Sequence, residues 1–304
     1  MTRWILPVGL LLCILVHGEV HATSEDGEAA AELGRAAELL DSDLDAAEDA
    51  IERALEMAPD EPEVQFMCGR VMGRKAEDSV LRALSYARRS LRCLERAAQL
   101  RPEHIPYRRG LMAFYLGAPG IAGGDESLAL EQVEAIEVLD PVEGVLARVD
   151  YLYAIDETEG VGDLLAASRQ RYPEASVLHF RHGLWLQQRE EYAQAHAAFV
   201  QGRAPLSLGE SPEDLAPALN ALYQIGRNAL FSESRVDEGI DALREYVSLE
   251  LPAAGVPELE WAYLRLAQLH LLAGDHQEAG RYAQLAAALE DQRLQSVLRD
   301  LSLD

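Results

Sequence analysis

The sequence is poor in several residue types, and each shortage excludes a class of protein. Only three cysteines are present among 304 residues, at positions 13, 68 and 93, which excludes a scaffold built from disulfides. Lysine occurs once, at Lys75, and the formal net charge is -25. A chain this acidic is a poor partner for nucleic acids and for anionic membranes.

The sequence also lacks the motifs of common catalytic and cofactor sites. It contains no Gly-x-Ser-x-Gly elbow, no dinucleotide-binding glycine run, no phosphate-binding Gly-Lys-Ser/Thr and no His-Glu-x-x-His. His179 and His182 lie three residues apart and could approach His196, as His270 could approach His276, but no third metal ligand follows from the spacing. We therefore expect no enzyme activity, no cofactor and no metal site, and imidazoles that are packed or at the surface.

Long hydrophobic runs are scarce, and the longest is at the start of the chain. Arg3 precedes an apolar run from Ile5 to Val16, and Val20-His21-Ala22 fits a small-residue cleavage site. Such a run falls short of the roughly 20 residues that span a bilayer. Residues 1–22 are therefore predicted to be a signal peptide cleaved after Ala22, which places the mature chain in the periplasm or outside the cell, without stable membrane insertion.

A pattern of paired helices recurs along the rest of the chain at a spacing close to 34 residues. In residues 176–207, Gly183 interrupts an apolar stretch, and Tyr192, Ala195 and Phe199 follow with an A-x-x-x-F spacing. The pattern recurs in residues 260–290, which carry Leu266, Ala267, Gly274, Asp275, Ala279, Ala283 and Ala286 at matching places. Prolines close other units before the next helix begins: Pro59, Pro102, Pro141, Pro173 and Pro252.

These residues resemble those of bacterial exported tetratricopeptide-repeat proteins, over nearly all of residues 27–290. Gly69 and Gly226 stand where that family places the glycine of the first helix. The resemblance implies an all-α, right-handed solenoid of about seven helical hairpins. The expected units are residues 27–60, 61–103, 104–142, 143–174, 175–208, 215–253 and 258–290, followed by a capping helix over residues 291–303.

Charge is distributed unevenly along the predicted repeats. Residues 23–63 carry 15 acidic and 2 basic side chains, whereas residues 64–110 carry 4 acidic and 11 basic ones. In the second unit, helical spacing places four arginines on one outward stripe: Arg82, Arg89, Arg92 and Arg96. The stripe is either a solvated face neutralised by the acidic first unit, or a docking surface for an acidic partner or a second copy of the chain.

In solenoids of the resembled family the first helix of each unit lines the concave surface, and the repeat phase selects candidates on that surface. They are Phe66, Arg70, Arg109, Arg148, Leu152, Phe180, Leu184, Asn220, Tyr223, Arg227, Trp261 and Leu264. Arginines suit carboxylates and aromatic residues supply rigid apolar area, so an extended peptide is the favoured ligand. The alternatives are a small anionic solute held between repeats and a homo-oligomer held by charge.

The sequence also predicts the conformation of one loop and the state of two cysteines. The glycine-rich loop from Gly117 to Asp125 is expected to close tightly, with Asp125 capping the following helix, since no positive charge accompanies it for anion binding.

The phase set by Val80, Leu84, Ala87 and Leu91 points Cys93 away from the apolar face. Free thiols at Cys68 and Cys93 are therefore expected, with a bridge between them as the alternative.

Overall fold

The computed structural model describes residues 24–203, 212–249, 256–288 and 290–301, and the predicted signal peptide over residues 1–22 lies outside this range. Within the described residues every regular element is helical and no strand occurs. The prediction of an all-α protein is confirmed. No helix in this part of the chain is long and apolar enough to cross a membrane.

The chain divides into two compact units, residues 1–124 and 125–304. The described elements of unit 1 are α1 (Ser24–Leu39), α2 (Leu44–Met57), α3 (Pro62–Asp78), α4 (Ala83–Leu100), α5 (Ile105–Gly117) and the short 3-10 helix η1 (Gly120–Ala122). Those of unit 2 are α6 (Glu126–Leu139), α7 (Pro141–Ala154), α8 (Val161–Arg171), α9 (Ser176–Gln188), α10 (Tyr192–Gly202), α11 (Pro212–Ser232), α12 (Val236–Ser248), α13 (Leu259–Leu272), α14 (His276–Ala286) and α15 (Gln292–Arg299). Each of the seven units expected from the sequence contains two consecutive helices of the series α1 to α14, with bounds that differ by a few residues at most.

The helices begin where sequence chemistry favours a start. Aspartate side chains at the N-caps of α2, α6, α7, α14 and α15 accept backbone N–H groups of the first turn. Proline occupies the first turn of α3, α5 and α7, where its missing N–H is not needed. Asp125 caps α6 as predicted, and Gly123 just before it adopts a left-handed backbone, φ +108°, which glycine tolerates.

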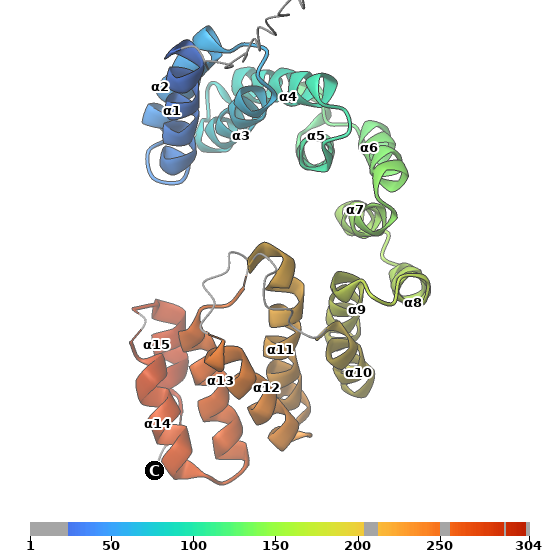
Figure 1. The fold of residues 1–304 in the computed structure, drawn as a ribbon, viewed down its shortest axis with the longest axis vertical. Helices are drawn as coiled ribbons and strands as arrows, with labels where there is room; N and C mark the ends of the chain where they lie inside the picture. The colour runs from blue at the N-terminus through green and yellow to red at the C-terminus, as the bar shows by residue number, and fades with distance from the viewer. Residues whose placement is uncertain (1–23, 204–211, 250–255, 289, 302–304) are drawn as a thin grey trace, which may run out of the picture. The chain divides into compact units, whose positions relative to one another are not determined.

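Most helices pack as antiparallel pairs with their sequence neighbours: α1 with α2, α3 with α4, α9 with α10, α11 with α12 and α13 with α14 (Figure 1). The middle of the chain departs from this pattern. In unit 1, α5 packs against α4, and in unit 2, α6 packs against α7 while α8 packs against α9. Helix α7 also contacts α8, the helix with which it was predicted to pair over residues 143–174, but less extensively than it contacts α6.

Glycines let the paired helices approach closely. A Cβ at Gly69 would lie 2.5 Å from Leu94 Cδ2, and a Cβ at Gly183 would lie 2.5 Å from Phe199 Cε1. Gly226 faces Leu243 in the same manner. These contacts give the repeat glycines a physical role: each receives a large side chain of the second helix.

We expect Gly183→Ala to lower the free energy of unfolding by about 2 kcal/mol, because the new methyl group would collide with the fully buried Phe199 ring. Gly280→Ala is the matched control, since a Cβ there meets no atom within 4 Å and alanine is the better helix former. It should raise stability by about 0.5–1 kcal/mol. Urea denaturation of both variants measures this difference, and a change of the same sign in both would contradict the packing role.

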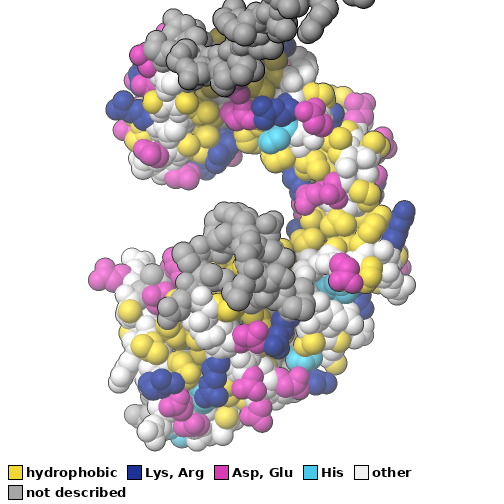
Figure 2. Space-filling view, in the orientation of Figure 1, with side chains coloured by type: hydrophobic (Ala, Val, Ile, Leu, Met, Phe, Trp, Pro, Cys, Tyr) yellow, Lys and Arg dark blue, Asp and Glu magenta, His cyan; other side chains and the backbone are white. Residues whose placement is uncertain are grey.

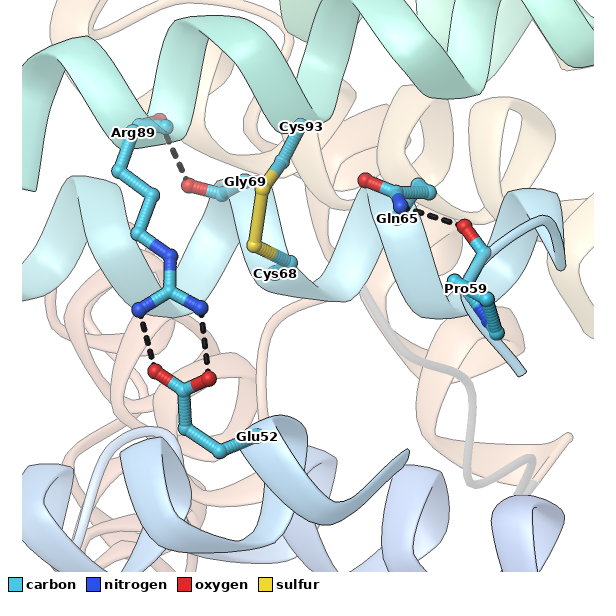
Figure 3. The surroundings of a disulfide bond; sticks show 8 residues. Glu52, Pro59, Gln65, Cys68, Gly69, Arg89 and Cys93 are labelled. Carbon is cyan, nitrogen blue, oxygen red and sulfur yellow. Dashed lines mark hydrogen bonds and ion pairs between the residues drawn. A yellow bond between two sulfur atoms is a disulfide. The ribbon is translucent and has the colours of Figure 1, made fainter. Parts of the chain in front are cut away.

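The cysteines differ from the expectation of free thiols. Cys68 on α3 and Cys93 on α4 are joined by a disulfide, with their Cα atoms 5.9 Å apart (Figure 3). The prediction was wrong because it read the apolar residues of α4 as one face, whereas Leu84 and Ala87 line a groove and Cys93 lies on a different, buried face. The buried face of α4 instead carries Tyr86, Cys93 and Ala97.

Candidate binding surfaces

In unit 2 the first helices of three successive pairs lie side by side, since α11 contacts both α9 and α13. We call the surface that these helices form the first-helix face. Helix α11 places Arg227 on it, and α13 places Arg265 close enough to oppose the charge of Arg227. These two arginines are the centre of the candidate site.

Each arginine is positioned by side chains of its own helix. Arg227 Nη1 donates to Gln224 Oε1 at 3.4 Å, and its Cζ lies 5.0 Å from the centre of the Phe231 ring. Arg265 is held in the same way by one glutamine and one aromatic ring. Its Nη1 donates to Gln268 Oε1 at 2.7 Å, and its Cζ lies 5.8 Å from the centre of the Trp261 ring.

Both guanidinium groups are half-buried, and neither has a carboxylate partner among the described residues. The Nε atoms of both Arg227 and Arg265 are buried and make no hydrogen bond within that part of the chain. Burial is the main cause that lowers the pKa of Arg227, and the charge of Arg265 adds to it, while Tyr223 opposes it. Unpaired donors of this kind cost folding free energy.

The structure places the other residues predicted for this surface in several environments. Tyr223 is buried and packs on Tyr246, and Leu264 is fully buried, so both belong to the core. Asn220 donates to the carbonyl oxygen of Ala216. Phe180, Leu184 and Trp261 are partly buried and pack against the same core.

Arg148 already has a hydrogen-bonding partner within the chain. Its Nε and Nη2 donate to the two carboxylate oxygens of Glu137 on α6, at 2.5 and 2.9 Å. This paired hydrogen bond raises the pKa of Arg148. The guanidinium is therefore already neutralised and oriented by a neighbour, and the predicted role of gripping a ligand carboxylate does not suit it. Leu152, on the same helix, is half-buried against a small cluster of Val149, Val161 and Leu165.

Phe66 and Arg70 lie in unit 1, where both line a groove between helices. The Phe66 ring contacts the Tyr107 ring, with centres 4.9 Å apart. Arg109 is half-buried on α5 and interacts with its surroundings. The predicted set is thus divided between the two units, and each part is described by itself.

Two of the four arginines in the predicted stripe pair with acidic side chains of unit 1. Arg89 donates two hydrogen bonds to Glu52 (Figure 3), and Arg96 Nη2 lies 2.5 Å from Asp60 Oδ1. Arg82 lies over the Tyr86 ring and Arg92 is exposed. Figure 2 shows acidic and basic side chains interspersed on the visible face. The stripe is therefore a partly neutralised face, which was one of the two alternatives.

The histidines sit in separate local environments. His179 Nε2 lies 2.9 Å from the carbonyl oxygen of Pro173, and His196 Nε2 lies 3.0 Å from Glu238 Oε2. His270 contacts Arg244 and Asp275, and His276 is exposed. Among the described residues no three histidine, cysteine or acidic side chains gather in an arrangement that could hold a metal ion.

We expect the folded state to lose stability as the pH falls from about 6.5 to about 4, in part through His182. Burial, with smaller contributions from Arg169 and His179, lowers the pKa of His182 to about 4 from its usual 6.5. In this window the unfolded chain binds a proton that folded His182 does not, so acid favours unfolding. Urea denaturation at about pH 7.5 and about pH 5 should show a smaller acid loss for His182→Leu than for the wild type. Equal losses would contradict this account.

Comparisons with known proteins identify the fold. No protein-family model and no curated protein matches the chain. A solved chain of the APC/C hetero-tetramer Cut9-Hcn1 is 12% identical with a TM-score of 0.51, and the match covers 91% of this chain and 54% of that one. The chain thus spans about half the length of that protein.

Two shorter proteins are matched over almost their full length. A tetratricopeptide repeat protein from Parabacteroides merdae is 10% identical, with a TM-score of 0.46 and coverage of 90% of this chain and 98% of that one. PilW, a type IV pilus biogenesis factor, is 14% identical, with a TM-score of 0.43 and coverage of 89% and 98%. With its successive helical hairpins, the chain has the α-solenoid fold of tetratricopeptide-repeat proteins, as predicted.

Proposed function

We propose that this protein is a binding scaffold without catalytic activity, and that unit 2 binds an acidic peptide segment of a partner protein through Arg227 and Arg265. The observation that carries the proposal is the pair of half-buried guanidinium groups on the first-helix face, neither of which has a carboxylate partner among the described residues. A carboxylate accepts two parallel hydrogen bonds from one guanidinium. Two arginines on adjacent helices therefore suit a segment with two acidic groups, or one acidic group shared between them.

The surroundings of the arginines favour a peptide. Phe231 and Trp261 lie beside the guanidinium groups and are partly exposed, so they offer rigid apolar area to the side chains that flank an acidic residue. A small solute held in a closed cavity was the alternative. The groove that Phe66 and Arg70 line includes neither Arg148 nor Arg227, so it gives that alternative no support.

A homo-oligomer held by charge is also less favoured. The acidic side chains of residues 23–63 and the basic ones of α3 and α4 pair within one chain: Lys75 with Asp45 and Glu48, Arg89 with Glu52, Arg96 with Asp60, and Arg101 with Glu63. Surface pairs of this kind contribute little stability each. They do reduce the charge that would attract a second copy.

We place this scaffold outside the cytoplasm, in the periplasm or in the secreted fraction. The predicted signal peptide supports this, and so does the disulfide between Cys68 and Cys93, because disulfides persist in oxidising compartments. The lack of catalytic motifs in the sequence supports a role in binding alone.

Selection from a random peptide library on the immobilised protein tests this function. The wild type should enrich peptides that carry aspartate or glutamate next to an apolar residue, and the variant with both Arg227→Met and Arg265→Met should not. Arg171→Met with Arg293→Met is the matched control, because it removes the same charge from exposed positions of unit 2. Enrichment of the same peptides by the Arg227/Arg265 variant, or of peptides without acidic residues, would contradict the proposal.

A further inference from the structure

A groove of about 890 Å³ opens on unit 1, and neither arginine of the unit 2 pair lines it. Helices α3, α4 and α5 and the η1 turn line it. Many of the lining residues are glycines and alanines, among them Gly69, Gly73, Ala87, Gly110 and Ala113. Larger apolar side chains, Leu40, Phe66, Leu84, Leu94, Phe114 and Ile121, complete it. The volume is at the upper end of the roughly 300–1,000 Å³ usual for ligand sites.

Helix α4 explains why this surface is apolar. One of its faces buries Tyr86, Cys93 and Ala97 in the core of unit 1. A second apolar face carries Leu84 and Ala87 into the groove. The helix therefore has more apolar surface than the packing within unit 1 covers.

Large apolar side chains remain exposed in the groove and in the turn that leads into α4. Leu84 is 37% exposed and Ile121 is 70% exposed, although both line it. Val80 and Leu81, in the turn that leads into α4, are almost fully exposed. An apolar surface of this kind marks an interaction site, because its burial is favourable by about 25 cal/mol per Å².

One charged side chain along the groove has no partner among the described residues. Arg74 is paired with Glu77 at 3.0 Å and with Asp41 at 3.8 Å, so these three side chains interact with one another. Arg70 is exposed, lines the groove and has neither a hydrogen bond nor an ion pair with the residues that the structure describes. One cation is thus left for a carboxylate of the occupant.

We propose that this groove binds an amphipathic α-helix of another protein, with its apolar stripe on α4 and an acidic side chain at Arg70. A helix satisfies its own backbone hydrogen bonds, whereas an extended peptide would bury N–H and C=O groups against a largely apolar lining. The Ser90 hydroxyl, one of the few polar groups in the lining, already donates to the Gly69 carbonyl oxygen at 2.7 Å. Glycines and alanines in the lining allow the backbone of a helix to approach closely.

The exposure of Leu84 and Ile121 also favours a helix over a small molecule as the occupant of the groove. A small ligand is usually covered over most of its surface by its pocket. Here the groove is open at Leu84 and Ile121, so a small molecule inside it would leave both side chains in water. A helix lying along the groove covers them.

The probe for this site is a fluorescent synthetic helix of about 18 residues, with leucines at every third or fourth position and one glutamate beside the leucine stripe. Fluorescence anisotropy measures its binding to the full chain. Ala113 is exposed on α5 and lines the groove, so Ala113→Trp fills the groove without disturbing the core. Ala37→Trp places the same side chain on an exposed position of α1, outside the groove, as the matched control.

The wild type and Ala37→Trp should bind the probe equally, and Ala113→Trp should weaken binding at least about tenfold. Leu84→Gln, which removes apolar contact without adding bulk, should also weaken it. Arg70→Gln should weaken binding of the probe but not of a version with glutamine in place of its glutamate. The variant with Arg227→Met and Arg265→Met should bind normally, which separates this site from the proposed function.

Several outcomes would overturn the proposal. They are equal binding by Ala113→Trp and the wild type, equal binding of a scrambled peptide that lacks the stripe, and absence of binding to the wild type. Binding of a fluorescent fatty acid in place of the helix would identify a lipid ligand instead. Self-association that Ala113→Trp abolishes would identify a second copy of the chain as the occupant.

Discussion

Replacing Arg227 and Arg265 together by methionine is expected to weaken binding of a selected acidic peptide by about 100-fold or more. Each hydrogen bond between charged groups contributes about 1.5–3 kcal/mol, so the loss of two gives at least about 3 kcal/mol, and 1.4 kcal/mol corresponds to tenfold. Isothermal titration calorimetry measures the change. The control with Arg171→Met and Arg293→Met should retain the wild-type affinity within about twofold.

The same substitutions should not weaken the fold. The two guanidinium groups repel each other and their Nε atoms lack partners among the described residues, so methionine should leave the free energy of unfolding unchanged or raise it by about 1 kcal/mol. Weaker binding with equal or greater stability is what a ligand site predicts. A variant that loses both affinity and stability would instead mark the arginines as structural.

Removing the disulfide between Cys68 and Cys93 is expected to lower the stability of unit 1 by about 3 kcal/mol. The bond closes a loop between residues 25 apart in sequence, which restricts the unfolded chain, and both cysteines lie in the same buried cluster. Urea denaturation of the wild type with and without reductant, and of the variant with both Cys68→Ala and Cys93→Ala, measures the loss. The reduced wild type should approach the variant, and reductant should not affect the variant.

A thiol assay controls for the presence of the bond. The unreduced protein, unfolded in denaturant, should show no alkylation at Cys68 or Cys93 by mass spectrometry, and full alkylation after reduction. Alkylation of both before reduction would show that the bond does not form in the isolated protein. The stability comparison would then not apply, and the disulfide would no longer support a location outside the cytoplasm.

The succession of helices could be predicted from the sequence because the repeat is marked by residues with a direct structural effect. Pro141 begins a helix, and Gly183 and Gly226 receive Phe199 and Leu243. The packing of α5 to α8 could not be predicted from these signals. It depends on which apolar faces meet in space, and the repeat spacing does not report this.

The errors in the candidate sites have two physical origins. A shift of one residue rotates a side chain by about 100° on a helix. The repeat phase selected Leu264, which is buried, and missed its neighbour Arg265, which joins Arg227 on the first-helix face. The spacing of 38 residues between these two arginines, close to one repeat, was a signal in the sequence that could have found the pair.

The second origin is the existence of partners from other helices. Arg148 was chosen as a free cation, but Glu137 of α6 lies against it because α6 and α7 pack together. The apolar residues of α4 were read as one face, whereas they form a buried face and a groove-lining face. Sequence spacing alone does not separate these two faces.

A double-mutant cycle between Arg265 and one aspartate of a selected peptide tests the central claim most directly. Affinities are measured for the wild type and Arg265→Gln, each with the aspartate peptide and with its asparagine version. If the two groups pair, each change alone should weaken binding and the two together should cost little more, with a coupling free energy of about 1.5–3 kcal/mol. Simple addition of the two losses would contradict the binding of an acidic peptide by the arginine pair.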